Sequence, residues 1–169
     1  MQTETTYIKA VSLKYPEQVV LAIAKDDQGK CNPIALGWMT YCSGKPPMIA
    51  IAVGLAHHSC EAIRHARAFV VAFPSEDMGE DTLYFGTVSG RDVDKLAARG
   101  TTTQPTTEID CVLLSDAVAN FECVLEKDVV TGDHALFVGR VVASHVNTDP
   151  AIKRLYNLGA MKLRGLRGS

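Results

Sequence analysis

The sequence has no apolar run that approaches the ~20 residues a membrane-spanning helix needs. It also lacks the basic stretch followed by an apolar segment that starts a secretory signal. Its five cysteines include no C-x-x-C pair, and an odd number of cysteines without that spacing does not form the disulfide framework of a small secreted protein. We therefore expect a cytoplasmic protein with no membrane partner.

Charge of one sign and aromatic residues are also scarce. The net charge is −2, and only 7% of the residues are aromatic. Without a strongly basic surface the protein has no global field that would hold it on nucleic acid, so we expect no nucleic-acid partner. The length of 169 residues, with 47% hydrophobic and 21% charged residues, is typical of one globular domain spanning residues 1–169.

Several catalytic motifs are absent as well. The sequence contains no G-x-S-x-G, no P-loop and no Rossmann fingerprint, which sets aside those hydrolases, nucleotidases and dinucleotide-binding domains. His57, His58 and Cys60 could ligate a metal, but no second ligand pair stands elsewhere in the chain. Because structural zinc usually takes paired ligands from two places in a chain, we expect no metal site.

What the sequence does contain is a series of short apolar runs bounded by turn residues. These runs predict strands at 19–24, 34–42, 48–53 and 69–73, and a hairpin over 117–146 that turns at Thr131-Gly132-Asp133. Short helices are predicted at 58–68, from Ser75 and at 92–100, with a loop at 101–108. The connections are too short for a parallel sheet, so the pattern predicts a mainly β protein, an antiparallel barrel with short helices packed outside it.

One cysteine is a candidate for a reactive thiol. Cys60 lies on the first turn of the predicted helix 58–68, where the helix N-terminus stabilises a thiolate. The alternative is that Cys60 is a small buried hydrophobic residue. The other cysteines stand in or beside apolar strands, where inert packing is expected: Cys31, Cys42, Cys111 and Cys123.

Two segments carry groups that bind anions. Ser59 is placed to begin a helix, where its hydroxyl can cap the helix beside free backbone N–H groups. The stretch "VSGRDVDKL" brings Ser89, Gly90, Arg91 and Lys95 close together after a flexible turn. The second stretch is also compatible with a solvated loop, but together the two segments indicate a site for a phosphate monoester.

These segments, in their order and spacing, resemble the flavin reductase-like proteins that have an FMN-binding split barrel. The matching pieces are "KCNPIALGWMT", "GKPPMIAIAV", "HHSCEAIRHARAFVVAF", "SGRDVDKLAARG", "FECVLEKDVVTGDHALFVGRVV" and "LYNLG". The resemblance implies a homodimer of antiparallel split barrels with one FMN per subunit. The chain departs from the family at Leu96, where the family has an aromatic residue.

The resemblance also implies which residues contact the cofactor. The phosphate would lie near His58, Ser59, Ser89, Arg91 and Lys95. The ring and ribityl chain would lie near Ala35, Gly37, Trp38, Met39, Thr40, Val53 and Gly54. His134 would approach the flavin or the nicotinamide as the catalytic residue, or else only cap the hairpin as a polar residue.

The activity that the resemblance implies is NAD(P)H-dependent flavin reduction. NAD(P)H would bind transiently and pass hydride to FMN, and the electrons would go on to free flavin, a ferric chelate or a partner protein. The alternatives are a flavoredoxin-like electron carrier that does not use NAD(P)H directly and a split-barrel binding module without flavin.

Overall fold

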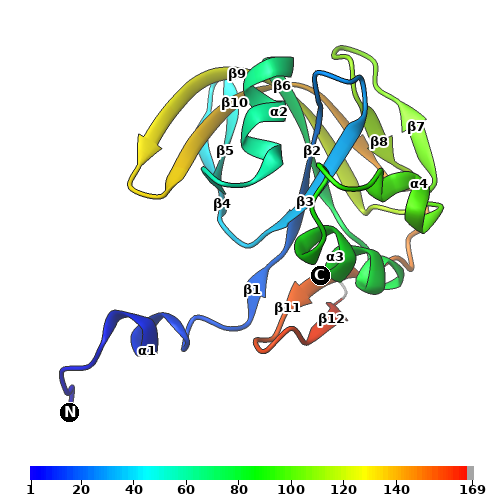
Figure 1. The fold of residues 1–169 in the computed structure, drawn as a ribbon. Helices are drawn as coiled ribbons and strands as arrows, with labels where there is room; N and C mark the ends of the chain where they lie inside the picture. The colour runs from blue at the N-terminus through cyan, green and yellow to red at the C-terminus, as the bar shows by residue number, and fades with distance from the viewer. Residues whose placement is uncertain (167–169) are drawn as a thin grey trace.

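A seven-stranded antiparallel sheet forms the centre of the structure, a computed structural model that describes residues 1–166 (Figure 1). The strand order is β3-β2-β6-β9-β10-β5-β4. The strands are β2 (Val20–Lys25), β3 (Cys31–Leu36), β4 (Met39–Gly44), β5 (Pro47–Gly54), β6 (Ala68–Phe73), β9 (Ala119–Thr131) and β10 (His134–Val146). The predicted mainly β, antiparallel fold is confirmed.

The two edges of this sheet are joined by only two residues. Strands β3 and β4 lie at opposite edges, yet only Gly37 and Trp38 separate them in the chain. The sheet must curl until its edges approach each other, although within residues 1–166 no ladder of hydrogen bonds joins β3 to β4. This is the predicted split barrel. The single strand predicted over 34–42 is wrong, because the chain breaks at Gly37 and Trp38 to pass from one edge to the other.

Both faces of the central strands are covered. Inside the barrel, residues of β2, β5, β6 and β10 pack against Cys60, Ala62 and Ile63 of helix α2 (His58–Ala66). Outside it, Leu21 and Ile23 pack against helix α3 (Gly79–Thr87) and the segment 109–117. The double burial explains why β2 is an uninterrupted apolar run. Helix α3 packs outside the barrel as predicted, whereas α2 contributes to the interior.

The remaining elements are short. The 3-10 helix η1 (Glu76–Met78) follows Ser75, and helix α4 (Lys95–Arg99) ends at Gly100, which adopts a left-handed φ of +62°. Strand β7 (Thr103–Pro105) lies within the loop predicted at 101–108 and pairs with β8 (Val112–Leu114) in a two-stranded sheet. A three-stranded sheet contains β1 (Glu17–Gln18), β11 (Arg154–Asn157) and β12 (Leu163–Leu166).

The β9–β10 hairpin and the N-terminal arm extend from the barrel (Figure 1). The hairpin turns at Gly132, whose φ is +66°, as the sequence predicted. Its register places His134 opposite Gly54 of β5. The arm carries helix α1 (Tyr7–Val11), which has no buried residue. None of the helices within residues 1–166 has the length and apolar character to cross a membrane.

Candidate functional site

Two adjoining cavities lie along β3, between the start of α2 and the segment that follows α3. The first has a volume of about 280 Å³ and contains the groups predicted to bind phosphate, His58, Ser59, Ser89, Arg91 and Lys95. The second has a volume of about 190 Å³ and is lined by Ala35, Gly37, Trp38, Gly54 and His134, among others. The two cavities share Ile34, His57 and Gly86. Together they form one elongated site with a polar end.

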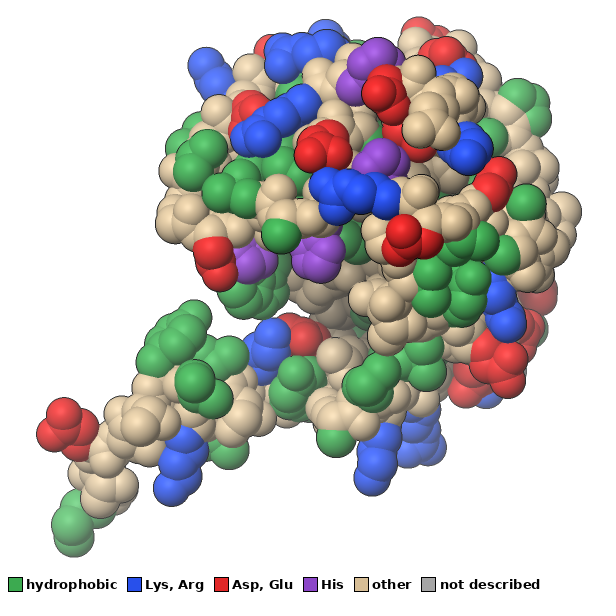
Figure 2. All heavy atoms as spheres, in the orientation of Figure 1, with side chains coloured by type: hydrophobic (Ala, Val, Ile, Leu, Met, Phe, Trp, Pro, Cys, Tyr) green, Lys and Arg blue, Asp and Glu red, His purple; other side chains and the backbone are tan. Residues whose placement is uncertain are grey.

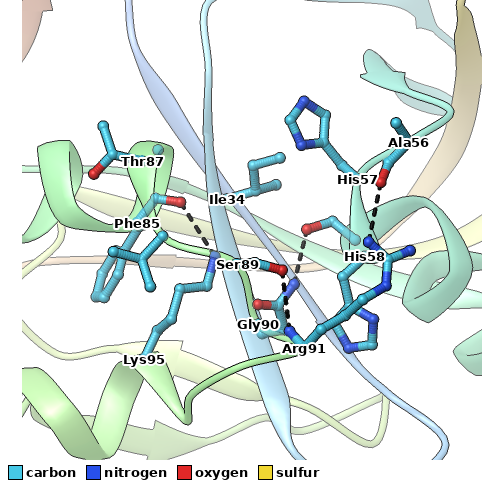
Figure 3. A pocket seen from close by; sticks show the side chains of 14 residues that line it. Ile34, Ala56, His57, His58, Phe85, Thr87, Ser89, Gly90, Arg91 and Lys95 are labelled. Carbon is cyan, nitrogen blue, oxygen red and sulfur yellow. Dashed lines mark hydrogen bonds between the residues drawn. The ribbon is translucent and has the colours of Figure 1, made fainter.

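A buried lysine occupies the polar end (Figure 3). Asp94 caps helix α4 by accepting a hydrogen bond from the Ala97 N–H, which places Lys95 on the first turn. Lys95 is only 3% exposed, and its ammonium group donates to the Phe85 carbonyl at 3.2 Å. Desolvation lowers the pKa of Lys95 to about 8. Within residues 1–166 no carboxylate pairs with it, so a buried cation retains donors for an anion.

Ser59 supplies a hydroxyl to the same cavity. Its Oγ accepts a hydrogen bond from Asn32 Nδ2 at 2.8 Å, which leaves its own proton free to donate into the cavity. The prediction that Ser59 caps α2 is wrong: the N-cap is His57, whose side chain makes no capping hydrogen bond. The hydroxyl is held by Asn32 of β3 instead. The Cys60 N–H is bound to the His57 carbonyl at 3.0 Å, but the N–H groups of His58 and Ser59 have no partner among the described residues and keep their capacity to bind an anion.

Ser89 supplies a second hydroxyl, from the loop between α3 and α4. Its Oγ accepts a hydrogen bond from the Arg91 N–H at 3.2 Å, so its proton is also free to donate. The Arg91 guanidinium donates to the Ala56 carbonyl at 3.1 Å and to Glu61 at 3.0 Å. Arg91 therefore fastens this loop to the start of α2, and a direct contact between Arg91 and phosphate stays a prediction.

The loop can approach Asn32 only because residue 90 is glycine. A Cβ atom on Gly90 would lie 2.0 Å from Asn32 Oδ1, closer than any side chain can come. Asn32 is 4% exposed, and its Oδ1 has no hydrogen-bond partner among the described residues. The glycine thus brings the loop that carries Ser89 against the asparagine that orients Ser59.

His58 lines the polar cavity, but its ring is bound to a carboxylate. His58 Nε2 lies 3.1 Å from Asp26 Oδ2, and Asp26 Oδ1 accepts hydrogen bonds from the N–H groups of Gln28 and Lys30, both at 2.9 Å. Burial opposes the ionisation of Asp26, but the hydrogen bonds from Lys30, His58 and Gln28 hold the pKa of its carboxyl below the usual value. His58 therefore anchors the start of α2 to the β2–β3 turn, and its contact with phosphate stays a prediction.

The second cavity lies at the split of the barrel. The rings of Trp38 and His134 are 4.8 Å apart between centroids and tilted by 37°. His134 Nδ1 lies 2.7 Å from Asp133 Oδ1, which orients the ring and leaves Nε2 without a partner among the described residues. A Cβ atom on Gly54 would lie 2.8 Å from the ring of His57, so the absence of a side chain at residue 54 leaves room for His57 between the two cavities.

Three of the predicted ring contacts have side chains that point elsewhere. Met39 and Val53 are buried in the barrel core, and Thr40 is exposed on β4. The side chains of Met39 and Val53 are therefore enclosed by the core, and a ligand contact through their backbone or through Thr40 stays a prediction. Conversely, Asn32 was not predicted as a site residue, because an asparagine within a strand carries no local signal. His57 was predicted only as a possible metal ligand, although it lines both cavities.

The structure also tests the reactive-thiol candidate Cys60 and the possible metal site. Cys60 is 1% exposed in the barrel core, and burial raises the pKa of its thiol. The reactive-thiol hypothesis is therefore wrong for Cys60, and the alternative of a small buried hydrophobic residue holds. Across residues 1–166 the structure places no group of three His, Cys, Asp or Glu side chains that could hold a metal ion.

Known proteins share both the sequence pattern and the fold. Residues 12–162 match the family model for the flavin reductase like domain. An uncharacterised protein of Archaeoglobus fulgidus is 30% identical over 139 residues, which cover 82% of this chain and 76% of the relative. One of Pyrococcus abyssi is 31% identical over 131 residues, 78% of this chain and 74% of the relative.

Solved structures extend the comparison to the fold. A flavoredoxin from Methanosarcina acetivorans superposes with a TM-score of 0.85 at 25% identity, covering 99% of this chain and 94% of that chain. An FMN-binding protein from Thermus thermophilus gives a TM-score of 0.85 at 22% identity, covering 99% and 96%. An NADH:FAD oxidoreductase from Streptomyces globisporus gives 0.82 at 19% identity, covering 99% of both chains. The fold is shared with all three, and because the family model spans residues 12–162, the chain belongs to the flavin reductase-like family.

Proposed function

We propose that the protein is a flavoprotein that binds FMN in the two adjoining cavities and reduces it with NAD(P)H. The observation that carries the proposal is the convergence of Lys95, Ser59 and Ser89 on the polar cavity, each with a donor that no described residue uses. Membership of the flavin reductase-like family supports the same assignment.

The polar cavity fits a phosphate monoester. Its three side-chain donors come from three separate elements, and the uncapped start of α2 adds backbone N–H groups. A phosphate dianion would compensate the desolvated charge of Lys95 and raise its lowered pKa toward the usual value. A neutral ligand would leave this buried cation unpaired, so the cavity favours a phosphorylated flavin over riboflavin.

The second cavity would hold the isoalloxazine ring. The path from the polar cavity passes Ile34, His57 and Gly86, which line both cavities. FMN held there would supply the redox chemistry, with NAD(P)H as hydride donor and free flavin, a ferric chelate or a partner protein as electron acceptor. His134, oriented by Asp133 and packed beside Trp38, would contact the flavin or the nicotinamide through its free Nε2.

We also propose that two copies of the chain form a homodimer. The side chains of Tyr7, Ile8 and Leu13 on the N-terminal arm are each at least three-quarters exposed, and Figure 2 shows hydrophobic side chains on this arm, away from the barrel. Isolated helices as short as α1 are unstable in water. A second subunit would cover these apolar side chains and support the helix.

Anaerobic mixing of the FMN-loaded protein with NADH or with NADPH tests the function. Bleaching of the flavin absorbance within seconds supports a reductase and identifies the donor. Bound flavin that neither nucleotide reduces, but that dithionite does, would show a flavoredoxin-like electron carrier instead. Protein that takes up no FMN would overturn the proposal as a whole.

A further inference from the structure

Two cysteines that are far apart in the sequence meet on the outer face of the barrel. Cys31 pairs with Lys25 across the β2–β3 ladder, so its side chain is on the same face as Ile23. The segment 109–117 covers this face, and Cys31 packs against the cluster to which Cys111 belongs. The Cys111 thiol also reaches the Ile23 carbonyl at 3.5 Å. The fold thus brings the two thiols together.

We propose that Cys31 and Cys111 form a peroxide-sensitive dithiol, a modification site that closes to an intrachain disulfide. Cys31 is half-buried and so open to a small oxidant, whereas Cys111 is buried beneath it. The other cysteines have no comparable neighbour: Cys60 and Cys123 lie in the barrel core, and Cys42 is exposed on β4.

The electrostatics assign different roles to the two sulfur atoms. The neighbouring Cys111 thiol, together with the nearby charge of Lys25, lowers the pKa of the Cys31 thiol. The pKa of Cys111 is raised, first by its interaction with Cys31 and then by burial. Lys25 is held in place by an ion pair with Asp110, the residue before Cys111. Because Cys31 is also the more exposed of the two thiols, it is the nucleophile, and the buried Cys111 is the resolving thiol.

The oxidant is hydrogen peroxide, which reduced flavins produce from dioxygen. The Cys31 thiolate attacks one oxygen of the peroxide; an S–O bond forms, the O–O bond breaks, and the departing hydroxide takes a proton to become water. Cys111 sulfur then attacks Cys31 sulfur; the S–S bond forms, the S–O bond breaks, and the departing hydroxide takes the proton of Cys111. The two thiols together lose two electrons, and one peroxide is reduced to two waters.

The site is separate from the proposed FMN cavity. Side chains alternate along β3, so Asn32 and Ile34 face the polar cavity while Cys31 faces the opposite side. The inference therefore does not rest on the proposed function, and it can be tested with added peroxide and without flavin.

The test is to treat the full chain with hydrogen peroxide, then count thiols in denaturant and map the peptides by mass spectrometry. The Cys42→Ser variant serves as the background because it removes the exposed thiol and with it any link between chains. We expect this variant to lose two thiols and two hydrogen atoms of mass, with one crosslinked peptide that joins Cys31 to Cys111. Dithiothreitol should restore both thiols.

Two further variants separate the roles. Cys111→Ser should leave a sulfenic acid on Cys31 that dimedone traps, whereas Cys31→Ser should protect Cys111 from oxidation. Far-UV circular dichroism checks that each variant is folded. If one of these variants does not fold, the peptide map of the Cys42→Ser protein still decides the question. Full retention of thiols, a crosslink between another pair, or sulfinic acid on Cys31 with Cys111 still reduced would overturn the proposal.

Discussion

Replacing Lys95 by methionine should weaken FMN binding while stabilising the protein without ligand. Lys95 is 3% exposed and, within residues 1–166, has only the Phe85 carbonyl as a hydrogen-bond partner. A hydrogen bond between charged groups contributes about 1.5–3 kcal/mol, so Lys95→Met should raise the Kd for FMN about 10- to 150-fold. Riboflavin, which has no phosphate, should lose little affinity.

The lowered pKa of Lys95 adds a pH dependence with a definite sign. Only the protonated amine pairs with phosphate, and its pKa is about 8 in the protein without ligand. The affinity for FMN should therefore fall about 30-fold between pH 7 and pH 9.5, and this decline should be absent from Lys95→Met.

Stability should respond to pH in the opposite direction. The folded-state pKa of about 8 lies below the ordinary value of 10.5, so between these values the folded state binds fewer protons than the unfolded state, and stability rises with pH. Below pH 8 the buried charge costs up to about 3 kcal/mol, which Lys95→Met removes. The variant should therefore have a higher Tm than the wild type at pH 7.

Fluorescence titration with FMN and riboflavin, and thermal unfolding without ligand, measure these effects. Lys127→Met is the matched control, because Lys127 is exposed on β9, outside both cavities. An unchanged Kd for FMN in Lys95→Met, or an equal loss of affinity for riboflavin, would show that Lys95 does not bind the phosphate.

Three other substitutions give separate tests. Gly90→Ala would place a Cβ atom 2.0 Å from Asn32 Oδ1, so it should raise the Kd for FMN about 10-fold or more. Gly44→Ala is the control, because a Cβ atom there would have no neighbour within 4 Å, and it should leave the Kd unchanged. Equal affinities of the two variants would contradict the close packing of Gly90 on Asn32. Glu122 is fully buried, accepts from three backbone N–H groups and a histidine, and has a pKa lowered to about 2 from 4.5. Glu122→Gln should lower the free energy of unfolding in urea by about 3 kcal/mol at pH 7. It should also reduce the loss of stability that the wild type shows as pH falls from about 4.5 to 2. An unchanged dependence of stability on pH would be evidence that the Glu122 carboxylate does not stabilise the fold. His134→Gln should slow flavin reduction by NAD(P)H about 10-fold or more in stopped flow at unchanged FMN affinity, and an unchanged rate would leave His134 a hairpin residue only.

The sheet was predictable because its signals are local. Short apolar runs and turn residues such as Gly132 locate strands and the hairpin without knowledge of the rest of the chain. The break at Gly37 and Trp38 was not predictable in this way, because the residues around it remain apolar and only the curl of the sheet separates β3 from β4. Strands β1, β11 and β12 have two to four residues each, too few to show a periodic pattern.

The site was predictable in its residue types more than in its contacts. Ser59, Ser89 and Lys95 were identified because hydroxyls and a cation beside turns are typical of phosphate sites, and all three line one cavity. The partners of Arg91 and His58 depend on the tertiary arrangement, which places an acceptor beside each of them. Local sequence cannot show which donors remain free after folding.

A crystal structure of the protein grown with FMN would show whether the two adjoining cavities hold the cofactor. We expect phosphate oxygens within hydrogen-bond distance of Lys95 Nζ, Ser59 Oγ and Ser89 Oγ, with the isoalloxazine ring in the cavity beside Trp38 and His134. A phosphate bound elsewhere, or a ring outside that cavity, would contradict it.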